Sequence, residues 1–294
     1  MVKMRFEPVS IIVPTKNRGG IINSTVKALL NLDYPKYEII VINDGSADDT
    51  EAILKDYSTK IRYNSNPVSK GPATARNIGV KLAKYHLLAF IDDDCIVDRN
   101  WLKSLVSNIS KDMECVTSWY EYALTHSFCI PKKIFDAIGY FDETFPYAYR
   151  EDTDFLFRLK DEGYKIKKIS KPMFKEIKPT TKGISDILRY FIRRLSVHMS
   201  DVLLYKKHAN RTKDYMKIKF NFLISPLEDF RRATGLWWRH RGLEFSISSP
   251  QGVVLIEGRE PLSWFIIFGF GISYVILVKL VRLLGSIKYG KLLI

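Results

Sequence analysis

The chain has 294 residues, of which 46% are hydrophobic, so it can bury a substantial core and is not expected to be disordered. Its three cysteines have no CxxC spacing and leave one unpaired in any disulfide scheme, which favours a reducing compartment. The net charge of +14 lies in the second half: residues 1–159 carry 20 basic and 21 acidic side chains, whereas residues 160–294 carry 26 and 11.

The first half of the chain alternates strand and helix patterns. Short apolar runs predict strands at Val9–Val13, Glu38–Ile42, Ile61–Asn64 and Leu87–Ile91. Helical patterns lie between them at Ile21–Asn31, Asp48–Asp56 and Ala73–Lys84. This alternation predicts a doubly wound parallel α/β sheet, whose ligands bind at the carboxyl ends of the strands. Polar side chains follow the strands at those ends: Thr15, Asn17, Asp44 and Asp92–Asp94.

Phosphate-binding glycine motifs are missing from the expected places. No GxGxxG follows the first strand, and no GxxxxGK[ST] occurs, so a dinucleotide fingerprint and a Walker loop are both excluded. The best candidate for nucleotide support is GPATARNIG at 71–79, where small residues let a helix approach closely and Arg76 and Asn77 project toward the strand ends. Taken alone, this segment fits an ordinary packed helix equally well.

Three carboxylates, Asp92, Asp93 and Asp94, end the apolar run Leu87–Ile91. Such a cluster is costly to leave uncompensated at the end of a buried strand, and a divalent cation is the simplest compensation. Oxygen ligands suit Mg or Mn, with Asp94 as the expected direct ligand and Asp92 reaching the metal through water or holding the ribose. The alternative is a solvated acidic turn that caps the next helix.

A second acidic pair, Glu151 and Asp152, opens a helical pattern that continues through Phe155, Leu156 and Leu159. This position places both carboxylates at a helix N-terminus on the side of the predicted site. Helix capping alone would also explain them.

Six motifs occur in the order PTKN, VINDGSADDT, GPATARNIG, FIDDDC, FDETF and REDTDFLFRL. Together they resemble the glycosyltransferase family 2 pattern on the GT-A fold, over roughly residues 9–170. The resemblance implies a doubly wound mixed sheet and an enzyme that moves a sugar from a UDP- or GDP-linked donor with inversion at the anomeric carbon. It further implies nucleotide binding by Asp44, Arg76, Asn77 and Asp92. The position of Thr15 and Asn17 at the strand ends adds them to the predicted nucleotide-binding residues.

The same resemblance makes Asp92 and Asp94 a metal-binding DXD pair, Asp152 the general base and Glu151 a residue that orients the acceptor. A base is needed for a hydroxyl acceptor but not for an acceptor phosphate, which is already anionic. The pair therefore favours a hydroxyl of a lipid-linked or membrane-delivered glycan. A polyprenyl-phosphate glycosyltransferase is one alternative, and a sugar nucleotidyltransferase, whose triphosphate loop is missing here, is another.

Two further groups of side chains are weaker candidates. Trp119, Tyr120 and Tyr122 lie between the two acidic motifs and are expected to stack on an acceptor sugar, although such clusters are as often core. His198 and His208 are candidates for a late metal or diphosphate contact, with a structural role as the alternative.

The last third predicts a membrane-associated region after a catalytic domain at 1–183. In the basic region 184–260, apolar residues at helical spacing from Leu188 to Leu203 predict one amphipathic helix. The segment 261–294 contains 17 uncharged residues, Leu262–Val278, which suit a short span, a monotopic or re-entrant insertion at 262–284, or a buried helix. Basic residues after this run predict that the catalytic domain faces the cytoplasm and meets an anionic membrane, with no nucleic-acid partner.

Overall fold

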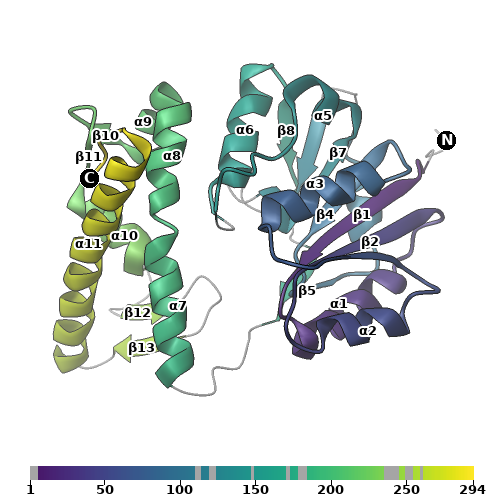
Figure 1. Ribbon diagram of the computed structural model, residues 1–294, viewed down its shortest axis with the longest axis horizontal. Helices are drawn as coiled ribbons and strands as arrows, with labels where there is room; N and C mark the ends of the chain where they lie inside the picture. Colours follow the sequence, from purple (N-terminus) through teal and green to yellow (C-terminus); the bar gives the residue numbers. More distant parts are fainter. Residues whose placement is uncertain are drawn as a thin grey trace. The chain divides into compact units, whose positions relative to one another are not determined.

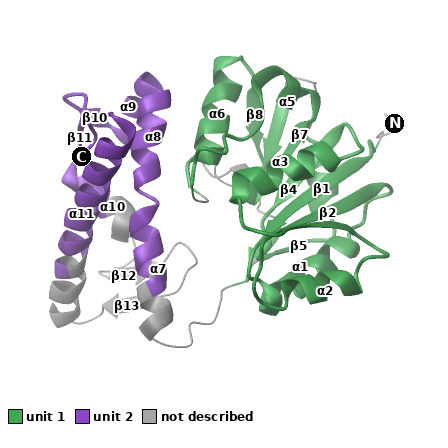
Figure 2. Cartoon of the chain, viewed as in Figure 1, with its two compact units in different colours: residues 1–177 green, residues 178–294 purple. Residues whose placement is uncertain are grey.

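The computed structural model describes residues 6–109, 114–118, 124–146, 149–169, 173–177, 184–234, 245–248, 254–258 and 261–294. The chain divides into two compact units, residues 1–177 and 178–294 (Figure 2). The sequence placed this boundary at residue 183.

Unit 1 is built on a mixed sheet of seven strands in the order β3-β2-β1-β4-β7-β6-β8. The strands β1 to β4 run parallel, whereas β7 pairs antiparallel with both β4 and β6. Helices lie on both faces of this sheet (Figure 1). The strands are β1 (Val9–Thr15), β2 (Tyr37–Asp44), β3 (Arg62–Asn66), β4 (Leu87–Ile91), β6 (Glu114–Thr117), β7 (Ser127–Pro131) and β8 (Lys165–Lys168).

The helices of unit 1 connect these strands in the expected alternation. They are α1 (Gly19–Leu30), α2 (Thr50–Asp56), α3 (Pro72–Leu82), α4 (Trp101–Val106), α5 (Lys133–Ile138) and α6 (Glu151–Asp161). A short 3₁₀ turn, η1 (Leu124–His126), precedes β7, and a small second sheet pairs β5 (Cys95–Val97) with β9 (Phe174–Glu176). The predicted strands and helices of the first half are therefore all present, with ends shifted by a few residues.

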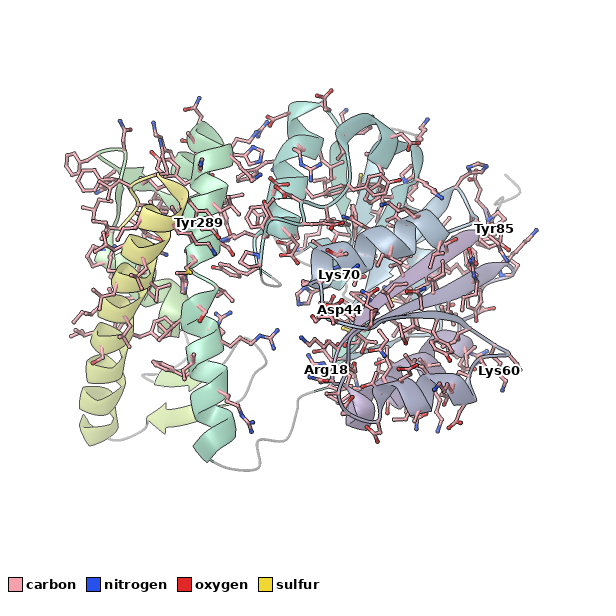
Figure 3. The ribbon with its side chains drawn as sticks, in the orientation of Figure 1. Arg18, Asp44, Lys60, Lys70, Tyr85 and Tyr289 are labelled. Atoms are coloured by element: carbon pink, nitrogen blue, oxygen red, sulfur yellow. The ribbon has the colours of Figure 1, made fainter. Side chains whose placement is uncertain are left out.

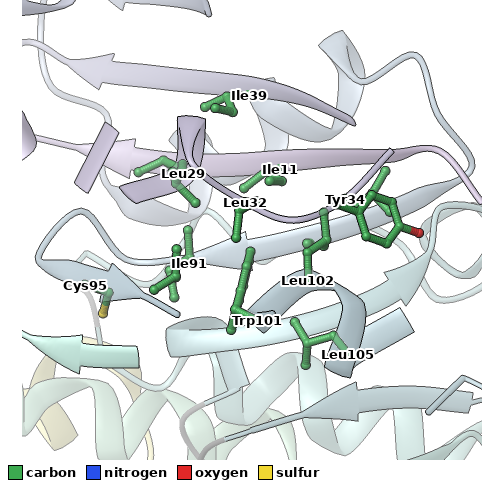
Figure 4. Close-up of a cluster of buried hydrophobic side chains, with 14 of the residues drawn as sticks. Ile11, Leu29, Leu32, Tyr34, Ile39, Ile91, Cys95, Trp101, Leu102 and Leu105 are labelled. Carbon is green, nitrogen blue, oxygen red and sulfur yellow. The ribbon is translucent and has the colours of Figure 1, made fainter. Parts of the chain in front are cut away.

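One part of the core of unit 1 lies between the sheet and helices α1 and α4. Every residue of the apolar run Leu87–Ile91 is buried, as a strand covered on both faces requires. Trp101 and Leu102 of α4 and Leu29 of α1 pack into the same cluster (Figure 4). The indole nitrogen of Trp101 donates to Ser127 Oγ at 2.8 Å, which satisfies the one polar group of this side chain.

Helix α3 lies unusually close to strand β1 because Gly79 has no side chain. A Cβ atom at this position would stand 2.4 Å from Cγ2 of Ile12. Packing at this distance brings the N-terminal turns of α3 to the carboxyl ends of the strands. This close contact also determines the position of Arg76, which lies one turn earlier in the helix, and so which groups at the strand ends its side chain can contact.

Unit 2 consists of helices and small hairpins. Where the sequence predicts one amphipathic helix from Leu188 to Leu203, the structure has two, divided at Val197 and His198. Its elements are α7 (Ile184–Ser196), α8 (Met199–Lys207), α9 (Ala209–Met216), β10 (Ile218–Lys219), β11 (Leu223–Ile224), α10 (Pro226–Thr234), β12 (Phe245–Ser248), β13 (Val254–Gly258) and α11 (Pro261–Tyr289).

Helix α11 continues for 29 residues, beyond the apolar run that suggested it. Within the part of the chain that the structure describes, no helix combines the length and apolar character that crossing a membrane requires.

Candidate active site

The acidic run after β4 is held by an arginine from the loop that follows β1. Arg18 donates from Nε to Asp93 Oδ1 at 3.2 Å and from Nη2 to Asp94 Oδ2 at 3.4 Å. The hydroxyl of Thr25 donates to the backbone oxygen of Asp93 at 2.7 Å. The middle carboxylate therefore points toward Arg18 and α1, while Asp94 keeps part of its surface exposed.

Crowding of carboxylates in a partly buried place disturbs their ionisation. Burial raises the pKa of Asp93 to about 6; the charge of Asp94 adds to this effect, and that of Arg18 opposes it. Burial, followed by the charge of Asp92, also raises the pKa of Asp94. Arg18 carries one positive charge against the two carboxylates that it contacts, so this part of the cluster favours further positive charge.

Arg76 of α3 joins the two acidic motifs. It is almost completely buried, and its Nη1 atom donates to Glu151 Oε1 at 2.9 Å while Nη2 donates to Asp92 Oδ1 at 3.2 Å. On the other side of Asp92, Nδ1 of His126 lies 3.5 Å from Oδ2. Residues far apart in the sequence, at 76, 92, 126 and 151, thus form one polar cluster at the carboxyl edge of the sheet.

The acidic pair at the start of α6 follows a strained turn. Arg150, the residue before the helix, has a left-handed backbone with φ of 79°, which is costly for a residue with a side chain. Glu151 is buried, and its Oε2 atom makes no hydrogen bond within the described residues, whereas Asp152 is partly exposed. The Thr153 amide donates to Asp152 Oδ1 at 2.7 Å.

Burial and the adjacent charge of Asp152 raise the pKa of Glu151 to about 7, although Arg76 opposes this shift. Burial also raises the pKa of Asp152, against the charges of Arg76 and His126. A carboxylate with a raised pKa is a stronger base, and Asp152 is the member of the pair that can reach solvent or a substrate.

Asp44, at the end of β2, organises the loop before α3. Its two oxygens accept four hydrogen bonds of 2.6 to 2.9 Å, from Asn66, Ser69 and the amides of Lys70 and Gly71. Burial alone would raise the pKa of this carboxyl, but these donors lower it, so Asp44 stays ionised. Figure 3 labels Lys70, Asp44 and Arg18 along one edge of unit 1.

The other predicted nucleotide residues hold neighbouring loops together. Asn17, which has a left-handed backbone with φ of 53°, accepts from the amide of Ala47, and its own amide donates to Ser46 Oγ, both at 2.8 Å. Thr15 is buried at the end of β1. Asn77 is buried and exchanges hydrogen bonds with the backbone of Phe141, so it links α3 to the FDETF turn.

Residues of the acidic cluster offer oxygen donors, which fit a hard divalent ion such as Mg or Mn. Among the described residues, no three histidine, cysteine or acidic side chains are grouped so as to enclose a metal by themselves. Mg is commonly held by one or two carboxylates together with substrate phosphates. Asp94, with its exposed surface, and Asp92 fit that arrangement; Asp93, turned toward Arg18, does not.

The remaining candidates belong to unit 2 or to residues that the structure does not describe. His198 is buried in unit 2, where its Nδ1 atom is 2.9 Å from Asp201 Oδ2 and its Nε2 atom lies 3.4 Å from the hydroxyl of Tyr274. His208 ends α8. A metal contact by either histidine stays a prediction. Trp119, Tyr120 and Tyr122 lie outside the described residues.

Sequence reasoning missed two members of the site, Arg18 and His126. Arg18 directly follows PTKN in the loop after the first strand, so its position at a strand end was a usable signal. His126 comes from η1, just before the antiparallel strand β7, and no periodicity in the sequence places that turn beside Asp92.

Comparison with known proteins gives a family match that covers the site. The model described as "Glycosyl transferase family 2" matches residues 10–171, more than half of the chain. The Poly-beta-1,6-N-acetyl-D-glucosamine synthase of Staphylococcus epidermidis is 34% identical over 94 residues, which are 31% of this chain and 23% of that protein. The matched part thus spans about a quarter of that relative.

Two other similarities extend further along the chain. The UDP-Glc:alpha-D-GlcNAc-diphosphoundecaprenol beta-1,3-glucosyltransferase WfgD of Escherichia coli is 28% identical over 240 residues, 68% of this chain and 95% of that protein. The solved mannosyltransferase PcManGT of Pyrobaculum calidifontis, in complex with GDP-Man and Mn²⁺, has a TM-score of 0.63 at 15% identity, over 95% of this chain and 88% of that one. The second similarity concerns the fold, which is of the GT-A type.

Proposed function

The chain belongs to glycosyl transferase family 2, and from that premise we propose that it is an inverting, divalent-metal-dependent glycosyltransferase. It moves a sugar from a nucleotide-sugar donor to a hydroxyl of a lipid-linked or membrane-delivered glycan. The proposal includes a membrane-associated enzyme whose catalytic unit faces the cytoplasm.

The observation that carries this proposal is the bridge made by Arg76 between Asp92 and Glu151. It places the acidic run after β4 and the acidic pair of α6 in one cluster, so that donor and acceptor groups can meet there. A solvated turn and a separate helix cap would not require a buried arginine between them.

The acceptor reaction follows from the exposure of Asp152. Its carboxylate takes the proton of the acceptor hydroxyl as that oxygen attacks the anomeric carbon. The new carbon–oxygen bond forms as the bond to the donor diphosphate breaks, and the electron pair of that bond leaves with the diphosphate. A single in-line displacement of this kind inverts the anomeric centre. Glu151 is held by Arg76 and acts on the acceptor side by positioning the turn that carries Asp152.

The leaving diphosphate needs positive charge where its own negative charge develops. A bound Mg or Mn ion supplies Lewis-acid stabilisation of that charge, with Asp94 and Asp92 as the side chains that would hold it. Arg18 adds a fixed cation next to Asp94 and its neighbour Asp93. Asp44 keeps the loop at 66–71 in place, which supports nucleotide binding at the neighbouring strand ends.

Two similarities support the substrate classes. The name of the Escherichia coli relative describes a UDP-linked donor and an acceptor on diphosphoundecaprenol, and the archaeal structure holds GDP-Man and Mn²⁺. From these two proteins we propose for this chain only the class of donor, a UDP- or GDP-sugar, and the class of acceptor, a glycan on a lipid carrier.

The test is transfer by the purified full-length chain with Mn²⁺ and a panel of UDP- and GDP-sugars. Each donor is offered with a sugar linked to polyprenyl diphosphate or with polyprenyl phosphate, and nucleotide release and the anomeric configuration of the product are measured. The proposal expects nucleotide release that depends on the donor sugar and a product with inverted anomeric configuration. It also expects transfer to the sugar linked to polyprenyl diphosphate. Transfer to polyprenyl phosphate alone would overturn the acceptor assignment, and a retained configuration would overturn the mechanism.

A further inference from the structure

The outward face of α11 in unit 2 is apolar. Large aliphatic side chains recur on it every three or four residues, with exposed fractions from 41% to 76%. At about 1.5 Å per residue, this row is about 22 Å long. We call it the α11 stripe; it consists of Ile272, Ile276, Leu280, Leu283, Leu284 and Ile287.

The opposite face of the same helix segment is buried and contains a charged cluster among apolar side chains. Arg282 is fully buried and donates from Nε and Nη2 to Asp201 of α8 at 3.1 and 2.9 Å, and from Nη1 to Asp229 of α10 at 2.7 Å. Lys279 pairs with the other oxygen of Asp229 at 2.8 Å. A surface helix of a soluble domain normally turns its apolar face inward. Here the buried ion pairs fix the rotation of α11 so that the stripe points out.

A hairpin joined to α11 also exposes aromatic side chains. Phe220 and Asn221, at the turn between β10 and β11, have positive φ of 52° and 64°, and the Phe220 side chain is 75% exposed. A bulky residue in this conformation costs about 1–2 kcal/mol. The Ile294 amide donates to the Phe222 carbonyl at 2.7 Å, and the Ile224 amide donates to the Ile294 carbonyl at 2.8 Å, which ties the hairpin to the segment after α11.

The net charge of unit 2, which carries these apolar side chains, is positive. Residues 178–294 contain 20 lysines and arginines against 8 acidic residues, a net charge of +12. Residues 261–294 contain four basic residues and no acidic one. Lys219 beside the turn and Lys288 near the end of α11 are both exposed. Another copy of this chain would bring the same positive charge to this face, whereas a surface of anionic lipid headgroups has the opposite charge.

We propose that the α11 stripe, together with Phe220, is a docking surface for an anionic lipid bilayer. The aliphatic and aromatic side chains enter the boundary between headgroups and acyl chains, and the lysines contact the headgroups. The helix lies in the plane of the bilayer, because its other face is bound to α8 and α10. This inference goes beyond the transfer reaction, and its test does not depend on that reaction.

The test is sedimentation of the full-length protein with vesicles of phosphatidylcholine alone or of phosphatidylcholine with one quarter phosphatidylglycerol. The wild type should bind the anionic vesicles, and less so at high salt. The double variant Leu280→Glu with Leu284→Glu removes two apolar contacts and adds two repelled charges, so its affinity should fall at least about tenfold. Val68→Glu places one glutamate at an exposed aliphatic position of unit 1, and this variant should bind like the wild type.

Three outcomes would overturn the proposal. One is no binding of the wild type to either kind of vesicle. Another is equal binding by the wild type and the double variant, with circular dichroism showing that both are folded. The third is a wild-type dimer in lipid-free solution that the double variant converts to a monomer without a change in vesicle binding, which would assign the stripe to a second copy of the chain.

Discussion

Nη1 of Arg76 donates to Oε1 of Glu151 across 2.9 Å, and both side chains are at least 96% buried. This pair connects α3 to the first residue of α6, and the second amino group of Arg76 reaches Asp92 beyond β4. A charged link in the interior is costly to break from one side, because the partner is left without compensation.

Arg76→Ala should therefore lower the free energy of unfolding by about 3–5 kcal/mol, since Glu151 and Asp92 lose their shared cation. Urea denaturation followed by circular dichroism measures this change. Lys81→Ala, in the same helix at an exposed position, is the matched control and should stay within about 0.5 kcal/mol of the wild type. Equal stability of the two variants would contradict the importance of the bridge.

Asp152→Asn should reduce turnover by about 10² to 10⁴, because the amide cannot take the acceptor proton. Donor affinity, measured by calorimetry, should stay near that of the wild type, since the proposal assigns donor and metal binding to Asp44 and Asp94. Asp161→Asn makes the same change at the other end of α6 and should leave turnover nearly unaltered. If the turnover of Asp152→Asn equalled that of the wild type, the residue would have only a capping role at the start of α6. The alternative acceptor, a polyprenyl phosphate, would then again be a candidate.

Asp94→Asn should weaken Mn²⁺-dependent donor binding and abolish transfer, because it removes a partly exposed carboxylate that the proposal assigns to the metal. Titration of the protein with the donor, with and without Mn²⁺, separates the metal effect from a direct effect on the nucleotide. Asp98→Asn is the matched control for this substitution. Asp98 lies in the loop before α4, where its side chain accepts a hydrogen bond from the backbone amide of Asn100. Full transfer by Asp94→Asn in the presence of a chelator would contradict the metal assignment.

Stability should also depend on pH through Glu151. Its pKa is raised from 4.5 to about 7 in the folded state, so its contribution to stability is complete below pH 4.5 and is lost as the pH rises through about 7. The wild type should lose roughly 1–3 kcal/mol from this group between pH 5 and pH 8. Glu151→Gln cannot ionise, so its urea midpoint should change less over the same interval. Parallel pH profiles of the two proteins would argue against a raised pKa.

Much of the fold of unit 1 follows from apolar periodicity, because each strand is a short buried run bounded by polar loops. The run Leu87–Ile91 was predicted with both of its ends correct. The split of the predicted helix at 188–203 was not visible, since neither Val197 nor His198 is a helix breaker. The outward rotation of α11 also escaped prediction, because it depends on Arg282 meeting acidic residues of two other helices.

The candidate site was predictable where its residues follow strands, as Asp44 and Asp92 do. The role of Arg76 was only partly visible: its helix placed it near the strand ends, but nothing in the sequence showed its contact with Glu151, 75 residues away. The prediction that Asn77 supports the nucleotide is untested, and the structure gives this side chain a link to Phe141. Contacts between distant segments are set by tertiary packing, which one sequence does not encode locally.

The close approach of α3 to β1 at Gly79 makes the polar cluster vulnerable to a change that touches none of its members. A single methyl group at this position would meet Ile12 and push the helix away from the sheet. Arg76 stands three residues earlier on the same side of α3, so the displacement would carry its guanidinium out of reach of one carboxylate or the other. A mutational scan limited to charged and polar side chains would therefore overlook a position on which the contacts of Arg76 depend.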